Sequence, residues 1–246
     1  MMISPMIHKM LRREDLRRLV TEIASTDPAE AYPAAKALES GMVHTLLDSP
    51  IALEAVRGRG GAPAPLPLAL LWYVPIRAAL CARGERDIDL ADYTASLALV
   101  FLPSRANRQV AHGENTIAAW KRSLDALPAD SVARGERAGY CGSLALWWAG
   151  LFPQWVARGA HGPGMIAAYV DFAAGALAVA ARTLQRTAPN TAGVYAAAAG
   201  RAALLREALD EAGRDYLGRD AHTATARLER YLARLKPATH PNDLSG

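Results

Sequence analysis

Apolar residues recur along most of this chain every three to four positions, which is the spacing of one helical face. No stretch alternates apolar and polar residues as a half-buried strand would. The pattern predicts an all-α protein. The predicted helices cover residues 14–25, 27–40, 42–56, 68–82, 89–101, 115–127, 138–157, 165–182, 191–217 and 221–235.

Residues 138–157 contain no charged side chain and are expected to form the central helix. Their apolar residues lie on every side of the helix, as in a helix enclosed by neighbours. Gly139, Gly142 and Gly150 would weaken this helix, which indicates that other backbones approach closely there. Pro153 predicts either a kink or a break after Phe152.

A loop rich in glycine follows at residues 158–164, and a second apolar helix restarts near Met165. The two helices predict an αα-hairpin. We expect a multi-helix bundle of roughly eight to ten helices around this buried central hairpin.

The chain divides into four predicted parts. Residues 1–57 are an N-terminal helical segment, 58–67 a linker of Gly and Pro, 68–236 the bundle core and 237–246 a flexible tail. Asp27 before Pro28 marks a helix start, and Asp89 is the expected cap of the helix that follows it. The helix at 68–82 is either kinked or begun at Pro75.

Two segments carry a resemblance to known proteins. CGSLALWWAGLFP at 141–153 and AYVDFAAGAL at 168–177 are similar to a widespread group of uncharacterised bacterial all-helical proteins, which have a GDxxLFxxGxFP segment and then YYxxxGxxAY. WYVPIRAAL at 72–80 and DLADYTASL at 89–97 resemble an upstream part of the same pattern. Four family positions differ. Ser143 stands for Asp, Ala78 for His, Ala173 for Gly and Leu177 for Tyr. The resemblance implies a helical fold and carries no assigned activity.

The net charge limits the kinds of partner that this protein is expected to bind, and the cysteine content indicates its cellular location. The net charge of +4 is modest for 246 residues, and argues against nucleic-acid binding. Cys81 and Cys141 form no CxxC, and no secretory signal precedes them, so a cytoplasmic location is expected. A membrane span requires about 20 apolar residues. Only 138–157 qualify on length, and Gly, Ser, Pro and Gln interrupt them, so no membrane span is expected.

The common catalytic motifs are absent. The sequence has no Glu-x-x-His pair, HExxH, GxSxG or Walker pattern, so neither a metal nor another cofactor is expected. Asp89 and Asp92 lie one helical turn apart and suggest a shared divalent ion, but the helix N-terminus also favours such residues. His112, Glu114 and His161 are loop candidates for a catalytic base or ordinary surface residues.

Arg77 interrupts an apolar helix and requires an anionic partner. Asp92 or Asp171 is the predicted partner, in a structural ion pair or an anion-binding pocket. Trp147, Trp148 and Trp155, with Tyr140 and Tyr169, either fill the core or line a ligand cavity.

Two functional hypotheses follow. The first is a protein-interaction or oligomeric scaffold module, because catalytic motifs are lacking and apolar helical surface is in excess. Its partner would be another protein or a second copy of the chain. The second is an enzyme or small-ligand sensor with an apolar pocket beside the central hairpin. The candidate ligand-binding residues for that pocket are Arg77, Asp92, Tyr93, Trp148, Tyr169 and Asp171.

Overall fold

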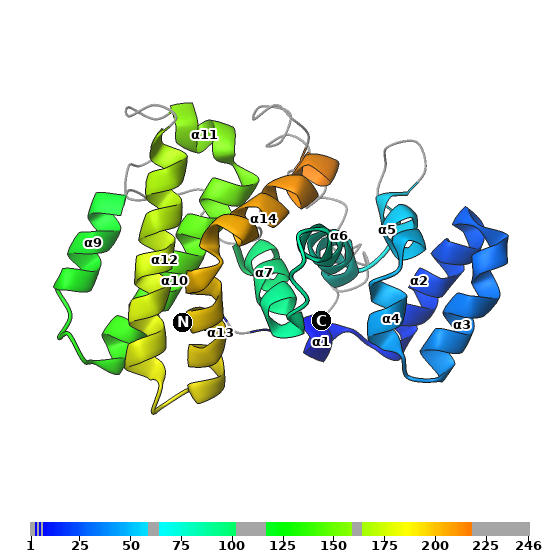
Figure 1. Ribbon diagram of the computed structural model, residues 1–246, viewed down its shortest axis with the longest axis horizontal. Helices are drawn as coiled ribbons and strands as arrows, with labels where there is room; N and C mark the ends of the chain where they lie inside the picture. Colours follow the sequence, from blue (N-terminus) through cyan, green and yellow to red (C-terminus); the bar gives the residue numbers. More distant parts are fainter. Residues whose placement is uncertain are drawn as a thin grey trace, which may run out of the picture.

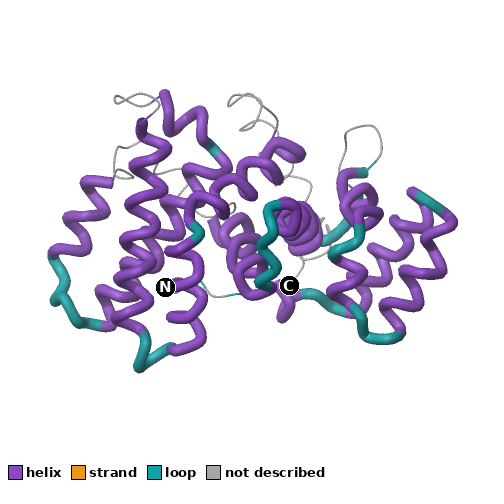
Figure 2. Tube along the Cα trace, viewed as in Figure 1, coloured by secondary structure: helices purple, strands orange, loops and turns teal. Residues whose placement is uncertain are grey.

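The computed structural model describes Ile3, Pro5 and residues 7–58, 64–101, 117–158 and 164–217. These residues form helices joined by turns, and there is no strand among them (Figures 1 and 2). The predicted all-α fold is confirmed. The predicted helix at 221–235, the tail, His112, Glu114, His161 and linker residues 59–63 lie outside the described residues.

Residues 13–57 form one end of the molecule (Figure 1). Their helices are α2 (Arg13–Thr26), the 3-10 helix η1 (Pro28–Glu30), α3 (Ala31–Glu39), α4 (Val43–Leu47) and α5 (Pro50–Arg57). The short helix α1 (Ile7–Met10) lies apart from this end, against the two helices in the middle of the molecule. The predicted start at Asp27 is confirmed, since its side chain accepts the Ala29 N–H. The predicted helix at 42–56 is two helices, because Ser49 caps a new helix that begins at Pro50.

Two helices in the middle connect this end to a larger group (Figure 1). The middle helices are α6 (Leu68–Ala82) and α7 (Ile88–Phe101). The larger group contains α9 (Ile117–Asp125), α10 (Val132–Leu151), α11 (Pro153–Arg158), α12 (Gly164–Leu184), α13 (Pro189–Gly200) and α14 (Ala202–Leu217). Helix α6 continues through Pro75 rather than beginning there. Ala64 and Leu66, at the end of the predicted linker, are buried in the core.

Helix α10 is the centre of the larger group and packs against α7, α9, α12 and α14. Every residue from Ala138 to Leu151 except Tyr140 is buried, as the uncharged sequence predicted. The predicted close approach of another backbone is present at Gly142 and Gly150, whereas at Gly139 the close neighbour is the Tyr195 side chain. A Cβ on Gly139 would lie 2.6 Å from Cε2 of Tyr195, and one on Gly150 would lie 2.5 Å from Cβ of Leu209. Glycine is therefore required at both positions for the neighbouring helices to fit.

The ends of α10 follow from local chemistry. The helix begins at Val132, earlier than predicted, because the Ser131 hydroxyl caps it by accepting the Arg134 N–H. It ends at Leu151, and α11 begins at Pro153. The predicted break after Phe152 is thus confirmed, since a proline inside a helix lacks the N–H that the ladder needs.

Helix α12 is the less buried half of the hairpin. Among the described helices it alone is long and apolar enough to cross a membrane, with a mean hydropathy of 1.7 over its most apolar window. Only 33% of that window is buried. The prediction that only residues 138–157 have spanning length was therefore wrong. The hairpin is enclosed on the α10 side and open on the outer side of α12.

Candidate functional site

Arg77 is buried, with its side chain 4% exposed, and its anionic partner is Asp48. Nε of Arg77 donates to Oδ1 of Asp48 at 2.8 Å, and Nη2 donates to Oδ2 at 3.1 Å. The ion pair is therefore bidentate. This hydrogen bonding to the carboxylate is the main cause that raises the pKa of Arg77. The predicted ion pair exists, but the prediction that Asp92 or Asp171 is its partner was wrong.

The Arg77 contact has a structural role. Asp48 follows α4 in the turn before α5, and its contact with Arg77 joins that turn to α6. Nη1 of Arg77 donates to the carbonyls of Arg86 and Asp87, just before α7. One guanidinium therefore fastens the N-terminal helices to α6 and to the start of α7, and its donors are occupied by the protein.

Asp92 binds the backbone of the N-terminal segment at Ile7. It is 3% exposed, and its Oδ1 accepts the Ile7 N–H at 2.7 Å and the Ser96 hydroxyl at 3.2 Å. Ile3 donates its N–H to the Tyr195 hydroxyl at 3.0 Å. Ile3 and Ile7 are both buried. We call Ile3, Pro5 and α1 the N-terminal strap, because together they tie the chain start to α7 and α13.

Tyr93 belongs to the same interior region. Its hydroxyl lies 2.6 Å from the Ser143 hydroxyl of α10, and its ring meets the Tyr195 ring edge-on with centroids 5.9 Å apart. Burial raises the pKa of Tyr93, and it raises the pKa of Tyr195 to about 12. These contacts join α7, α10 and α13 through satisfied polar groups. Sequence reasoning did not identify Tyr195 or the strap, because no local pattern links residues so far apart.

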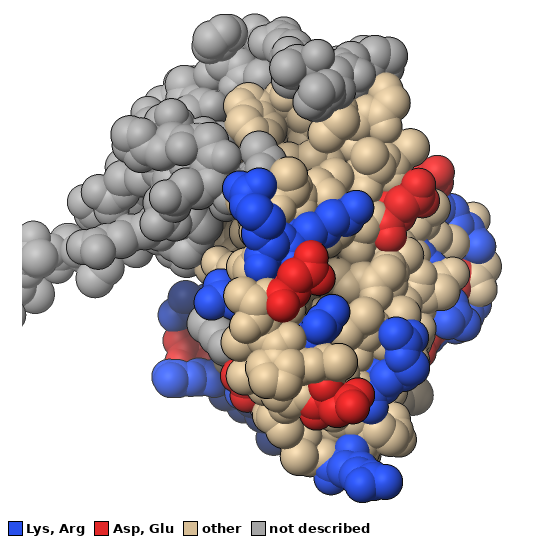
Figure 3. All heavy atoms as spheres, turned by 90° about the vertical axis from the view of Figure 1, so that its left-hand side faces the viewer, with Lys and Arg blue, Asp and Glu red and all other residues tan. Residues whose placement is uncertain are grey.

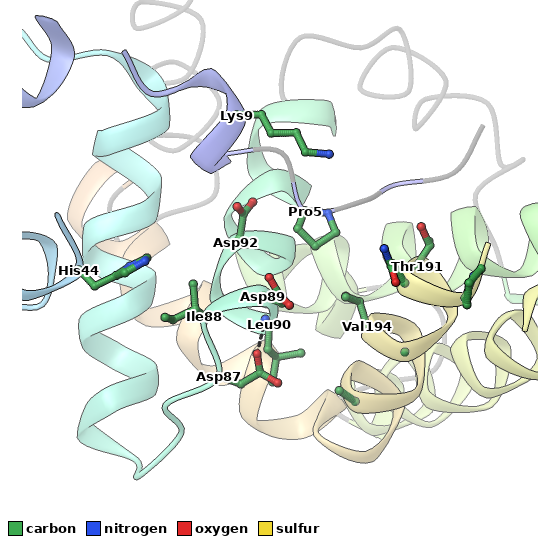
Figure 4. Close-up of a pocket in the computed structure, with 14 residues that line it drawn as sticks. Pro5, Lys9, His44, Asp87, Ile88, Asp89, Leu90, Asp92, Thr191 and Val194 are labelled. Carbon is green, nitrogen blue, oxygen red and sulfur yellow. Dashed lines mark hydrogen bonds between the residues drawn. The ribbon is translucent and has the colours of Figure 1, made fainter. Parts of the chain in front are cut away.

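A surface groove of about 1040 Å³ opens beside the strap. Figure 4 shows the aspartates at the start of α7 between His44 of α4 and Thr191 and Val194 of α13. Asp87 caps α7 by accepting the Leu90 N–H at 3.1 Å, so the prediction that Asp89 is the cap was wrong. No three His, Cys, Asp or Glu side chains within the described ranges are arranged to hold a metal.

Trp148 and Tyr169 lie in two separate aromatic contacts. Trp148 packs against Trp147, Phe152 and Trp155 at the corner between α10 and α11. Its indole N–H, like that of Trp147, has no hydrogen-bond partner in the part of the chain that the structure describes. Tyr169 instead meets Trp120 of α9, with centroids 5.6 Å apart. Of the six candidate residues, only Asp92 and Tyr93 lie together: Asp92 contacts the N-terminal strap directly, and Tyr93 contacts Tyr195, which binds the strap. The other four lie apart from them.

Asp171 lies on the exposed side of α12. We define the α12 outer face by the partly or fully exposed residues that recur there every three or four positions: Gly164, Ala168, Asp171, Gly175, Ala178 and Arg182. A Cβ on Gly164 or Gly175 would meet nothing within 4 Å. Neither Asp171 nor Arg182 forms an ion pair within the described ranges.

Charges are mixed on the side of the molecule that carries α9 and α12. Figure 3 shows basic and acidic side chains interspersed with uncharged surface there. A nucleic-acid-binding face would gather basic residues in one patch. This face does not have that character.

Comparisons with known proteins do not assign this chain to a family. The chain matches no family model, no curated protein and no solved structure. The resemblance to uncharacterised bacterial helical proteins stays a prediction.

Proposed function

We propose that this protein acts by binding another polypeptide chain through the α12 outer face. The observation that carries the proposal is the exposure of α12, because only 33% of its most apolar window is buried. The outer face carries the small residues Gly and Ala between its two charges, and exposed apolar surface on a protein is a candidate for an interaction site. Two charged residues on this face, Asp171 and Arg182, distinguish it from a surface that contacts lipid hydrocarbon.

The shape of the face also supports a protein partner. Gly164, Ala168, Gly175 and Ala178 project no long side chain, so a second helix can lie close to the α12 backbone. Partly exposed Val179 borders the same surface and adds apolar area. A close helix–helix contact buries such small residues without ordering flexible side chains.

The test compares two arginine substitutions on exposed positions. Gly175→Arg places a long charged side chain in the middle of the α12 outer face, and Ala203→Arg does so on the exposed side of α14. We expect the unmodified protein to self-associate in light scattering or to recover a partner in pull-downs, Ala203→Arg to retain that binding and Gly175→Arg to lose it. A strict monomer that recovers no partner, or binding that survives Gly175→Arg, would contradict the proposal.

A small-ligand sensor is the second candidate, supported by the groove of about 1040 Å³ beside the strap. Lys9 and Asp89 both line it, so a ligand with both charge signs would find complementary groups. Native mass spectrometry of the purified protein tests this role. A bound molecule whose retention depends on Asp89 supports it, and a bare polypeptide mass together with no binding in a metabolite screen rejects it.

A further inference from the structure

This inference depends on the proposed interaction role and identifies the partner. We propose that the α12 outer face binds a second copy of this chain, with the two α12 helices antiparallel across a two-fold axis between Gly175 and Ala178. The dimer would be isologous, with the same surface on both subunits. Three observations support it: the positions of two charges, the absence of an ion pair for either charge among the described residues, and the open glycine at the centre.

The two charges are placed symmetrically. Asp171 and Arg182 lie eleven residues apart, about 16 Å along the helix axis. Their midpoint falls between Gly175 and Ala178. In an antiparallel pair centred there, each Asp171 faces the partner's Arg182, so two ion pairs flank the axis. A parallel pair would instead place like charges opposite each other, which disfavours it.

Both charges are available for such a contact. Asp171 and Arg182 are exposed, and neither takes part in an ion pair within the described ranges. Arginines at other helix surfaces do find carboxylates, as Arg83 does with Glu211 at 2.9 Å. The described part of the chain thus leaves these two opposite charges without an ion pair on the α12 outer face.

The glycine at the centre meets no neighbour in the part of the subunit that the structure describes. A neighbouring helix occupies the space beside Gly139, Gly142 and Gly150, where a Cβ would otherwise lie. A Cβ on Gly175 would meet nothing within 4 Å. Glycine in a helix interior costs about 1 kcal/mol relative to alanine. A second helix that approaches closely at the two-fold axis gives Gly175 the same role that those three glycines have in α10.

A charge-exchange experiment tests the arrangement. Asp171→Arg gives a chain with two positive charges on the face, and Arg182→Asp gives one with two negative charges. We expect each variant alone to dimerise about tenfold or more weakly than the unmodified chain, and an equimolar mixture of the two to form a heterodimer. Retention of both homodimers, or failure of the mixture to associate when the unmodified chain dimerises, would overturn the antiparallel arrangement.

Cysteine cross-linking then distinguishes the two orientations. In a Cys81→Ser background, chains with Asp171→Cys should form a disulfide with chains carrying Arg182→Cys, because these positions face each other. Neither variant should cross-link with itself, since identical positions are about 16 Å apart along the axis. Efficient self-cross-linking of each variant would indicate parallel packing and reject the inference.

The failures of the two proposals can be told apart. If the unmodified chain is a monomer at every concentration but recovers a partner that Gly175→Arg loses, the α12 outer face binds a different protein and only the dimer inference fails. If the chain is a monomer and recovers no partner, both proposals fail. Dimerisation that survives charge reversal and Gly175→Arg places the contact on another surface.

Discussion

At the scale of single residues, the buried charged side chains Arg77 and Asp92 are both hydrogen-bonded within the protein. Arg77 binds Asp48 through two nitrogens, and Asp92 accepts the Ile7 N–H. The sequence indicated that a charged residue in an apolar helix needs a partner, but not which one. Asp48 lies in a short turn whose position depends on how α4 and α5 pack, so helical periodicity does not locate it.

Asp48→Ala is the sharpest test at this scale. It leaves the Arg77 guanidinium buried without its counter-charge, and we expect the free energy of unfolding to fall by about 3 kcal/mol. Urea denaturation measures the change. Glu14→Ala is the matched control, because the Glu14–Arg18 pair is exposed and its loss should change stability by less than about 0.5 kcal/mol. Equal effects of the two substitutions would show that the Arg77 contact is not structural.

At the scale of elements, the same residue type has different roles in the two helices of the hairpin. Glycines in α10 meet neighbouring helices at distances that exclude a Cβ, while Gly175 in α12 faces open space. The sequence predicted the close approaches in α10 from glycines inside an uncharged helix. It did not predict that α12 would be half exposed, because an apolar helix surface looks the same whether a neighbour in the same chain or another chain covers it.

Paired alanine substitutions measure this difference. Gly139→Ala forces a Cβ against the Tyr195 ring and should lower the free energy of unfolding by about 1 to 3 kcal/mol. Gly175→Ala should raise the stability of the isolated subunit by up to about 1 kcal/mol, because alanine is the better helix former. Under the dimer proposal it should also weaken self-association. Thermal unfolding at low and high protein concentration separates the two effects.

The N-terminal strap gives a second test of an element. Ile7 is fully buried, so Ile7→Ala should lower the free energy of unfolding by about 2 to 5 kcal/mol. Lys9→Ala, on the exposed side of the same short helix, is the control and should have little effect. Guanidinium titration gives both values. An Ile7→Ala protein as stable as the unmodified chain would mean that the strap does not contribute to the fold in solution.

At the scale of the whole molecule, buried tyrosines connect helices that are distant in the sequence. Burial raises the pKa of Tyr93 above its usual value, and raises the pKa of Tyr195 from 10.0 to about 12. A phenol whose pKa is higher in the folded than in the unfolded state lowers the stability of the fold as the pH rises above about 10. The interior around these two rings therefore makes a contribution to stability that depends on pH.

The alkaline limb of the stability profile tests this role. Below pH 10, Tyr195 is protonated in both states and stability is constant with respect to this group. Between pH 10 and 12 the unfolded chain releases the proton and the folded chain does not, so stability falls by about 2 to 3 kcal/mol. Urea denaturation at pH 9 to 12 should show this loss. The free energy of unfolding should fall less steeply with pH in Tyr195→Phe. Tyr32→Phe, at a residue 75% exposed, should leave the slope unchanged.

The sequence by itself determined the helical class, the enclosed segment at 138–157, its break at Pro153 and its close-packing glycines, because periodicity, proline geometry and the absence of a side chain act locally. Only the tertiary structure decided that Asp48 pairs with Arg77, that the chain start lies against Asp92 and Tyr195, and that the outer side of α12 stays open. Those outcomes depend on which helices are neighbours in space, and that is set by packing among elements far apart in the chain.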